Sequence, residues 1–261
     1  MWKEYSQHKQ TYKQLADKYG CSIRTIQRKL DKYAPNPVIH SNKNQEVIVL
    51  LDTTYWGRNF GVMLFRDAIS KKNLLHYYVN TETIALYKKG IEELKSQGYI
   101  IKAIVCDGRR GLFNAFDGIP VQMCQFHQLS IIRRYLTTKP KLEPSKELKE
   151  IASLVTKTDK ESFEGLLKEW YESYKEFINQ RTINPDTNRT YYTHKRVRSA
   201  YRSLITNLDW LFTWYDNLEL NIPKTTNGID GYFADLKAKL RNHNGLSRQR
   251  KTKFIEDYLN R

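Results

Sequence analysis

The chain has 261 residues, and its 44 lysine and arginine residues outnumber its 28 acidic residues, giving a net charge of +16. This excess predicts a polyanionic partner, nucleic acid or an acidic membrane surface, and disfavours a soluble enzyme that has no charged partner. Hydrophobic residues make up 40% of the chain, which is enough for a folded core and excludes a disordered basic tail. Because no apolar stretch is long enough to span a membrane and the charge is spread along the chain, we expect nucleic acid and no membrane.

The cysteines and the N-terminal residues predict a cytoplasmic, nucleoid-associated protein. Cys21, Cys106 and Cys124 are odd in number and widely spaced, without a Cys-x-x-Cys pair, so a disulfide scaffold is not expected. The first ten residues, MWKEYSQHKQ, lack the apolar segment of a secretory signal.

Residues 11–33 carry the start and stop signals of two short helices. Thr11 and Gln14 form a capping box that begins a helix at Tyr12, and Gly20 supplies the left-handed residue that ends it. Ser22 caps a second helix. Its apolar residues follow at helical spacing: Ile23, Ile26 and Leu30.

Ala16, Gly20 and Ile26 have the spacing of the small residue, turn glycine and core aliphatic of helix-turn-helix domains. The second helix exposes side chains suited to phosphates and base edges, namely Arg24, Thr25, Gln27, Arg28 and Lys32. We therefore predict an all-α helix-turn-helix DNA-binding domain over 1–36, followed by a proline-broken linker over 37–45. An ordinary helical hairpin with a solvated basic face is the alternative.

The middle of the chain alternates apolar runs with helical patterns. The runs 47–51, 59–66, 74–79, 100–106 and 121–124 predict strands, and 81–97, 112–116 and 127–136 predict helices. In chain order this gives three strands, a helix, a strand, a helix, a strand and a helix. That order predicts an α/β fold, a mixed-sheet core of the ribonuclease H-like type.

Two aspartates follow buried strands in this pattern. Asp52 comes directly after 47–51, and Asp107 directly after 100–106. Carboxylates on neighbouring strands repel each other, and a divalent cation such as Mg²⁺ or Mn²⁺ removes that repulsion. Each Asp alone could instead cap the turn that follows it.

These residues give the chain a resemblance to a known family. It resembles Mutator-like transposases and their bacterial insertion-sequence relatives, a branch of the Asp-Asp-Glu (DDE) transposases. Asp52 in LLDTTYWG resembles the first catalytic acid, and Asp107 in VCDGRRGL the second. Cys124 and His127 match the Cys-x-x-His signature of the branch. The resemblance implies that Asp230, after Thr225-Thr226-Asn227, is the third acid, where the family usually has Glu.

The third acid has competing interpretations. Asn227 and Asp230 are also spaced as N-cap and N3 of a helix, where an acid favours the helix dipole. Asp235 and Glu219 are the fallback candidates. Cys124 and His127 are too few for a closed zinc site. The resemblance implies that Cys124 and His127 are a signature of the family, and that His127 either contacts DNA or orders the site.

The chain becomes helical between 140 and 221, which resembles the all-helical insertion that the family places between its second and third acids. Helices are expected over 145–155, with 160–178 and 196–215 following, the second of them opened by a capping box of Thr158 and Glu161. The core would then consist of 46–139 and 222–261, the latter ending in a basic segment. Further DNA contacts are expected from Arg109, Arg110, His127, Lys237 and Arg241.

The expected function is that of an insertion-sequence DNA transposase. The resemblance implies binding of terminal inverted repeats, two Mg²⁺ (or Mn²⁺) ions on Asp52, Asp107 and Asp230, strand cleavage and strand transfer to target DNA, and a homodimer or larger assembly on DNA. A DNA-binding regulator or domesticated relative with impaired catalysis is one alternative. A structure-selective nuclease of the same fold is another, and an RNA-binding protein is a third.

Overall fold

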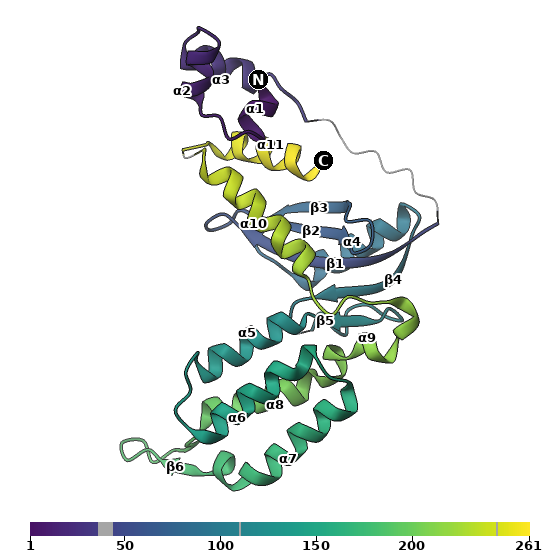
Figure 1. Cartoon of the computed structure of the whole chain (residues 1–261), viewed down its shortest axis with the longest axis vertical. Helices are drawn as coiled ribbons and strands as arrows, with labels where there is room; N and C mark the ends of the chain where they lie inside the picture. Colours follow the sequence, from purple (N-terminus) through teal and green to yellow (C-terminus); the bar gives the residue numbers. More distant parts are fainter. Residues whose placement is uncertain (36–43, 110, 244) are drawn as a thin grey trace.

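The computed structural model describes residues 1–35, 44–109, 111–243 and 245–261. A five-stranded sheet lies in the middle of the molecule, with strand order β3-β2-β1-β4-β5 (Figure 1). β1, β2 and β3 pair antiparallel, whereas β4 and β5 run parallel to β1. The strands are β1 (Gln45–Tyr55), β2 (Gly61–Asp67), β3 (Asn73–Val79), β4 (Tyr99–Cys106) and β5 (Val121–Met123). The chain is therefore a mixed α/β protein, as the sequence predicts at this level.

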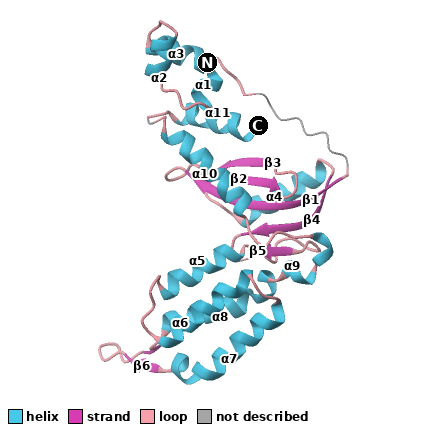
Figure 2. Cartoon of the chain, in the orientation of Figure 1, coloured by secondary structure: helices cyan, strands magenta, loops and turns pink. Residues whose placement is uncertain are grey.

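Helices cover both sides of this sheet (Figure 2). Before the sheet come α1 (Trp2–Ser6), α2 (Tyr12–Lys18) and α3 (Ile23–Asp31). Within and after it come α4 (Ile84–Ser96), α5 (Gln125–Leu136), α6 (Glu143–Ser153), α7 (Lys160–Asn179), α8 (Lys195–Leu211), α9 (Thr213–Asp216), α10 (Asn227–Arg241) and α11 (Arg248–Leu259). Two short 3₁₀ turns lie at Leu154–Thr156 and Leu218–Leu220.

The alternation of apolar residues along β1 divides the core in two. Val47, Val49 and Leu51 belong to a cluster with residues of α4 and of α5–α8. Ile48 and Leu50 point to the opposite face and pack in a second cluster with α10 and α11. Successive strand residues face opposite sides, so one buried strand supports both layers.

The short-range signals of the N-terminal helices are confirmed. Thr11 and Gln14 form the capping box, Ser22 accepts a hydrogen bond from the backbone of Thr25, and Gly20 has φ +57°. Of the three apolar residues with helical spacing, Ile26 and Leu30 are buried, whereas Ile23 is 45% exposed.

The N-terminal helices dock on α11 and share its apolar cluster. The Arg250 guanidinium donates to both carboxylate oxygens of Asp31, at 2.9 and 2.7 Å. The Tyr33 hydroxyl donates to Asp257 at 2.7 Å, and the Tyr33 ring stacks on Trp2 with centroids 4.4 Å apart. Of the predicted linker 37–45, all but the last two residues lie outside the described ranges.

The expected all-helical insertion is wrong in one respect. Between α7 and α8 the chain forms an antiparallel hairpin of β6 (Arg181–Ile183) and β7 (Thr190–Tyr192). β-branched and aromatic residues flank a polar turn there, a pattern that favours two short strands.

Three local predictions also differ from the structure. Residues 112–116 form turns rather than a helix. α7 begins with Asp159 as its cap, which accepts from the backbone of Ser162, in place of the predicted box of Thr158 and Glu161. The helix predicted over 196–215 breaks at Phe212, because Gln122 of β5 accepts from the backbone of Trp214 and so replaces a helical partner.

Within the described residues no helix has the length and apolar character needed to cross a membrane.

Candidate active-site cleft

Asp52 lies inside β1 and not after its end, which corrects the sequence prediction. The antiparallel partner β2 continues to pair beyond this point, with Asp52 opposite Leu64 and pairing maintained to Tyr55. On the other side of β1, the parallel pairing with β4 ends at Leu50 opposite Val105. The pairing with β4 therefore stops before it reaches Asp52. Asp52 Oδ1 accepts a hydrogen bond from the backbone N–H of Thr53 at 2.8 Å.

Asp107 directly follows the last residue of β4, as predicted. Leu50 and Val105 are the last pair between β1 and β4, and Asp52 and Asp107 each follow that pair by two residues. The two acids are close enough for the charge of Asp107 to contribute to the raised pKa of Asp52. Asp107 Oδ1 accepts from the backbone N–H of Arg109 at 3.2 Å.

Asp230 lies in the first turn of α10, but the N-cap of that helix is Thr226 and not the predicted Asn227. The Thr226 hydroxyl oxygen lies 3.0 Å from Asp230 Oδ2 and 3.3 Å from Cys124 Sγ. The backbone N–H of Thr226 also donates to Cys124 Sγ, at 3.3 Å. The end of β5 and the start of α10 are thus joined at the predicted third acid.

Cys124 and His127 form a polar pair beside this junction. The contact with Cys124, together with the negative charges of Asp230 and Asp52, raises the pKa of His127 to about 9 in spite of burial. Although burial opposes it, hydrogen bonding from His127 and Thr226 holds the pKa of the Cys124 thiol below its ordinary value. His127 therefore carries a positive charge at neutral pH, next to two acids.

Residues of β1, α5 and α10 line one cleft, which has a volume of about 510 Å³. Asp52, Asp230 and His127 line it together with two cations of α10, Lys237 and Arg241. The remaining lining residues are Thr53, Thr54, Phe233 and Ala234. Asp107 does not line this cleft, and Arg110 lies outside the described residues.

The surroundings of Asp52 raise the pKa of its carboxyl. Burial, and then the negative charges of Asp230 and Asp107, raise its pKa to about 7 against the opposing effects of His127 and the Thr53 N–H. A carboxyl whose ionised form is destabilised by neighbouring carboxylates is a group that gains from a bound cation.

The donors of the cleft fit a hard divalent cation. Asp52 and Asp230 offer carboxylate oxygens, the ligands that Mg²⁺ and Mn²⁺ prefer, and the negative charge they share favours a cation between them. In the described part of the chain, no group of three or more His, Cys, Asp or Glu side chains is arranged to hold a metal ion.

One acid near the cleft escaped sequence reasoning. Glu82 pairs with Arg109 at 3.1 Å and accepts from the Tyr87 hydroxyl at 2.8 Å. The Tyr87 oxygen also lies 2.8 Å from Thr53 Oγ1, so this chain of polar contacts runs from α4 to the residue after Asp52. Its only signal in the sequence is an acid directly before the helix cap Thr83.

The fallback acids lie elsewhere. Asp235 is on α10 but lines a different cavity, where it pairs with Lys239. Glu219 is exposed in the 3₁₀ turn before α10.

The residues expected to read DNA are accessible on α3 and its end. Arg24, Arg28 and Lys32 are exposed, and Thr25 and Gln27 are partly buried. Thr25 Oγ1 lies 3.0 Å from Ser22 Oγ, within the helix cap. Arg109, also expected at DNA, donates to the Glu82 backbone carbonyl at 2.7 Å in addition to its ion pair.

A scan against protein-family models finds no match for the chain, and a search of curated proteins finds none either.

Proposed function

We propose that this protein is a DNA transposase with a ribonuclease H-like catalytic core and an N-terminal helix-turn-helix. The observation that carries the proposal is the cleft where Asp52 and Asp230, far apart in sequence, lie together with His127, Lys237 and Arg241. Acids and cations that line the same cleft suit a site that holds a metal ion and a DNA phosphate at once.

The chain's own residues divide the work of the site. Asp52 and Asp230 would hold the divalent cations, and Asp107 would join them from the neighbouring strand. When bound, Mg²⁺ or Mn²⁺ ions supply positive charge that favours ionisation of the attacking hydroxyl and stabilises the leaving oxygen. The Thr53 N–H fixes Asp52 Oδ1, and the Thr226 hydroxyl lies against Asp230 Oδ2.

The cations of the cleft act on DNA. Lys237 and Arg241 follow Asp230 along one side of α10, and they would neutralise the phosphates on either side of the cut. His127, protonated at neutral pH, would donate a hydrogen bond to a phosphate oxygen.

Water cleaves the phosphodiester at the element end, and the 3′-hydroxyl that is released attacks target DNA. No protein nucleophile takes part.

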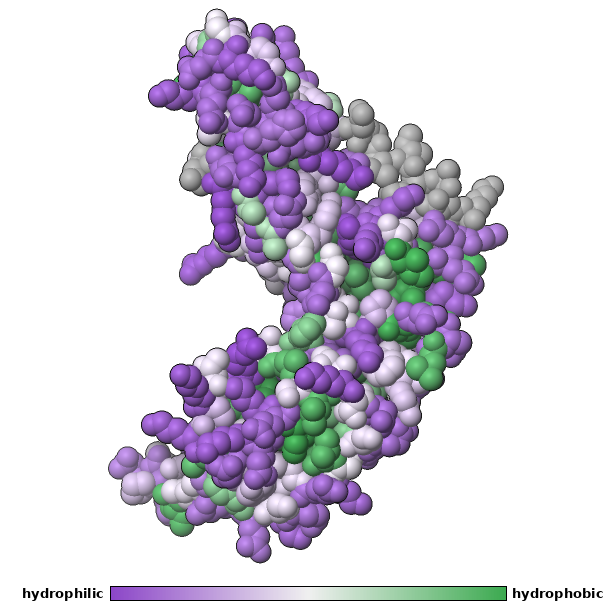
Figure 3. Space-filling view, in the orientation of Figure 1, coloured by the Kyte–Doolittle hydropathy of each residue, from purple (hydrophilic) through white to green (hydrophobic). Residues whose placement is uncertain are grey.

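The shape of the molecule supports a long DNA partner. Figure 3 shows a hollow on one side, between the α10–α11 region and the helical insertion, with hydrophilic residues on both flanks. The exposed residues of α3, Arg24, Arg28 and Lys32, would read the terminal inverted repeats from the N-terminal end. Two element ends must be held together for transposition, so a dimer or larger assembly is expected on DNA.

The test is cleavage of DNA that carries the inverted repeats flanking the gene, measured with Mg²⁺ and with a chelator. Asp52→Asn and Asp107→Asn are expected to abolish cleavage and to leave DNA binding intact. Asp230→Asn should do the same, whereas Asp235→Asn, on the same helix but in another cavity, should still cleave. Asp117→Asn, at an exposed acid, is the control for loss of charge alone.

Cleavage by Asp52→Asn or Asp107→Asn at the rate of the unmodified protein would overturn the catalytic assignment. Tight binding of the repeats without cleavage by the unmodified protein, under any divalent cation, would favour the DNA-binding regulator.

A further inference from the structure

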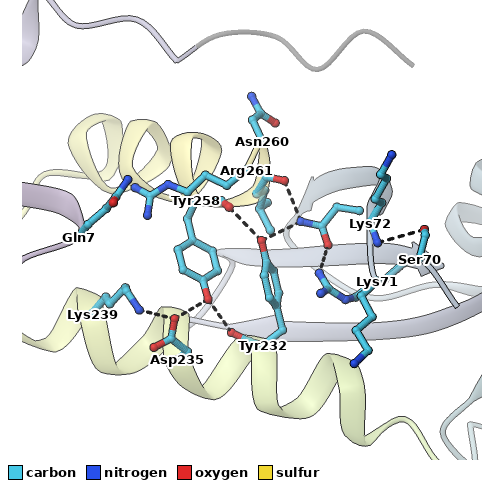
Figure 4. Close-up of a pocket in the computed structure, with 13 residues that line it drawn as sticks. Gln7, Ser70, Lys71, Lys72, Tyr232, Asp235, Lys239, Tyr258, Asn260 and Arg261 are labelled. Carbon is cyan, nitrogen blue, oxygen red and sulfur yellow. Dashed lines mark hydrogen bonds and ion pairs between the residues drawn. The ribbon is translucent and has the colours of Figure 1, made fainter. Parts of the chain in front are cut away.

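A second cavity, of about 790 Å³, opens between the β2–β3 hairpin, α10 and α11. Figure 4 shows the hairpin residues at one end of it, Gln7 at the other, and Asp235 of α10 facing Tyr258 of α11. The lining is rich in cations, with Arg66, Lys71, Lys72, Lys239 and Arg261 set against a single acidic side chain, that of Asp235.

This cavity is separate from the proposed catalytic cleft, because α10 turns opposite sides to the two. Successive helical residues are rotated by about 100°, so Asp230, Lys237 and Arg241 fall on one side of the helix. Tyr232, Asp235 and Lys239 of the same helix fall about 170° away. They line the second cavity, so no residue of α10 is shared between the two.

Arg66 is a cation of this cavity that is held entirely by neutral groups. Its Nη1 donates to Asn73 Oδ1 at 2.5 Å, and its guanidinium lies 4.2 Å from the centre of the Tyr232 ring. Asn73 is itself fixed, because its amide donates to the Tyr232 hydroxyl and to the Leu259 carbonyl, both at 2.7 Å. Arg66 is half-buried in a set position, and no described carboxylate balances its charge.

The other charges divide into compensated and uncompensated groups. Lys239 pairs with Asp235, which also accepts from the Tyr258 hydroxyl at 2.6 Å, and Arg261 pairs with Asp257. Within each of these two pairs, the opposite charges neutralise each other. Lys71 and Lys72 are exposed on the hairpin and have no ion pair with a described residue.

Three uncompensated cations thus remain at this cavity: Arg66, Lys71 and Lys72. The acid nearest to them in the chain, Asp67, is buried and accepts from the backbone N–H groups of Ile69 and Ser70 in the hairpin turn. Asp67 is therefore committed to the turn and does not line the cavity.

We propose that this cavity is a phosphate-binding site, in which Arg66, Lys71 and Lys72 hold the phosphate of a nucleotide unit. A partly desolvated arginine without a counter-ion lowers its energy by binding an anion, and its planar group matches two phosphate oxygens. The volume is that of a small-molecule site and exceeds what a bare phosphate ion needs. The phosphate belongs either to a free nucleotide or to the backbone of DNA beyond the catalytic cleft.

The experiment measures binding by calorimetry, with inorganic phosphate, 2′-deoxyadenosine 5′-monophosphate and unphosphorylated deoxyadenosine as probes. The test variant is the double change Lys71→Gln and Lys72→Gln. The matched control is Lys139→Gln and Lys141→Gln, which removes the same charge from an exposed loop between α5 and α6. Duplex DNA is titrated in parallel over a range of salt concentrations.

For a free-nucleotide site, the monophosphate should bind and the nucleoside should not, with affinity falling about tenfold in the hairpin variant and unchanged in the control. For a DNA site, the slope of log affinity against log salt should instead become shallower by about two in the hairpin variant relative to the control. Equal phosphate binding and equal salt slopes in the two variants would overturn the proposal. All of these readouts are independent of DNA cleavage, so failure here leaves the proposed catalytic function standing and the reverse also holds.

Discussion

Replacing Asp52 by Asn is expected to stabilise the metal-free protein at neutral and alkaline pH, although it removes a proposed catalytic acid. Burial and the charges of Asp230 and Asp107 raise the pKa of Asp52 to about 7. An aspartate in an unfolded chain has a pKa near 4. The folded state therefore binds this proton more tightly than the unfolded state does. The stabilisation is complete below about pH 4 and is lost as the pH rises through about 7.

The size of the effect follows from the difference in pKa. Each pKa unit corresponds to about 1.4 kcal/mol, so a rise of about three units limits the effect to about 4 kcal/mol. The amide oxygen of Asn still accepts the Thr53 N–H and carries no charge to be repelled. The expected gain in free energy of unfolding is about 2–4 kcal/mol at about pH 8 and near zero at about pH 4.

Urea unfolding of the two proteins with a metal chelator, at about pH 4 and about pH 8, measures this gain. Asp117→Asn serves as the control, because Asp117 is exposed and its replacement should change neither value. Added Mg²⁺ should then stabilise the unmodified protein and not Asp52→Asn. Equal unfolding free energies for Asp52→Asn and the unmodified protein at about pH 8 would refute the expectation.

Four further changes test the packing and the cleft. Gly90→Ala should destabilise the fold by about 1–3 kcal/mol in urea unfolding, because the new Cβ would lie 2.1 Å from the buried Phe65 ring. Gly165→Ala, on a helix with open space around it, should stabilise the fold by about 0.5–1 kcal/mol, and a loss would contradict the packing described. Tyr33→Phe removes the hydrogen bond to α11 and should cost about 1 kcal/mol, read as faster hydrogen exchange in α2 and α3. Lys237→Gln should weaken duplex binding and reduce its salt slope by about one, and an unchanged slope would remove it from the DNA path.

Local signals in the sequence predicted local structure well. The box of Thr11 and Gln14, the turn at Gly20 and the cap at Ser22 each depend on contacts between residues a few positions apart. The short apolar runs likewise predicted the central strands to within a few residues of their ends, except for β1. Such features are visible in one sequence because the chain segment that carries the signal also forms the structure.

What the sequence missed depends on partners that are distant in the chain. Asp52 looked like the residue after a strand, but pairing with β2 extends β1 past it to Tyr55. Ile23 has helical spacing, yet the helices that pack on α3 leave it exposed. From the sequence, α11 was recognised only as part of a basic segment. Its apolar residues could not be assigned to the core, because the N-terminal helices that pack on them are distant in the chain.

The candidate site shows the same division. The sequence suggested Asp52 and Asp107 by strand ends and by resemblance, and Asp230 by resemblance alone. The meeting of Asp52 and Asp230 in one cleft comes from the packing of α10 on the sheet. The contact of Thr226 with both Cys124 and Asp230 has no short-range signal, since it joins β5 to a helix about a hundred residues later.

The docking of α1–α3 on α11 has a consequence for the order in which the chain acquires its structure. The N-terminal helices are synthesised first, yet Tyr33 and Asp31 find their partners only when α11 has left the ribosome. Until then, the Ile48 and Leu50 side of the sheet also lacks its cover, because α10 and α11 supply it. Contacts of such long sequence separation form late and slowly. The growing chain therefore carries an uncovered apolar sheet face until α11 is complete, and truncated products that end before α11 should aggregate or require a chaperone.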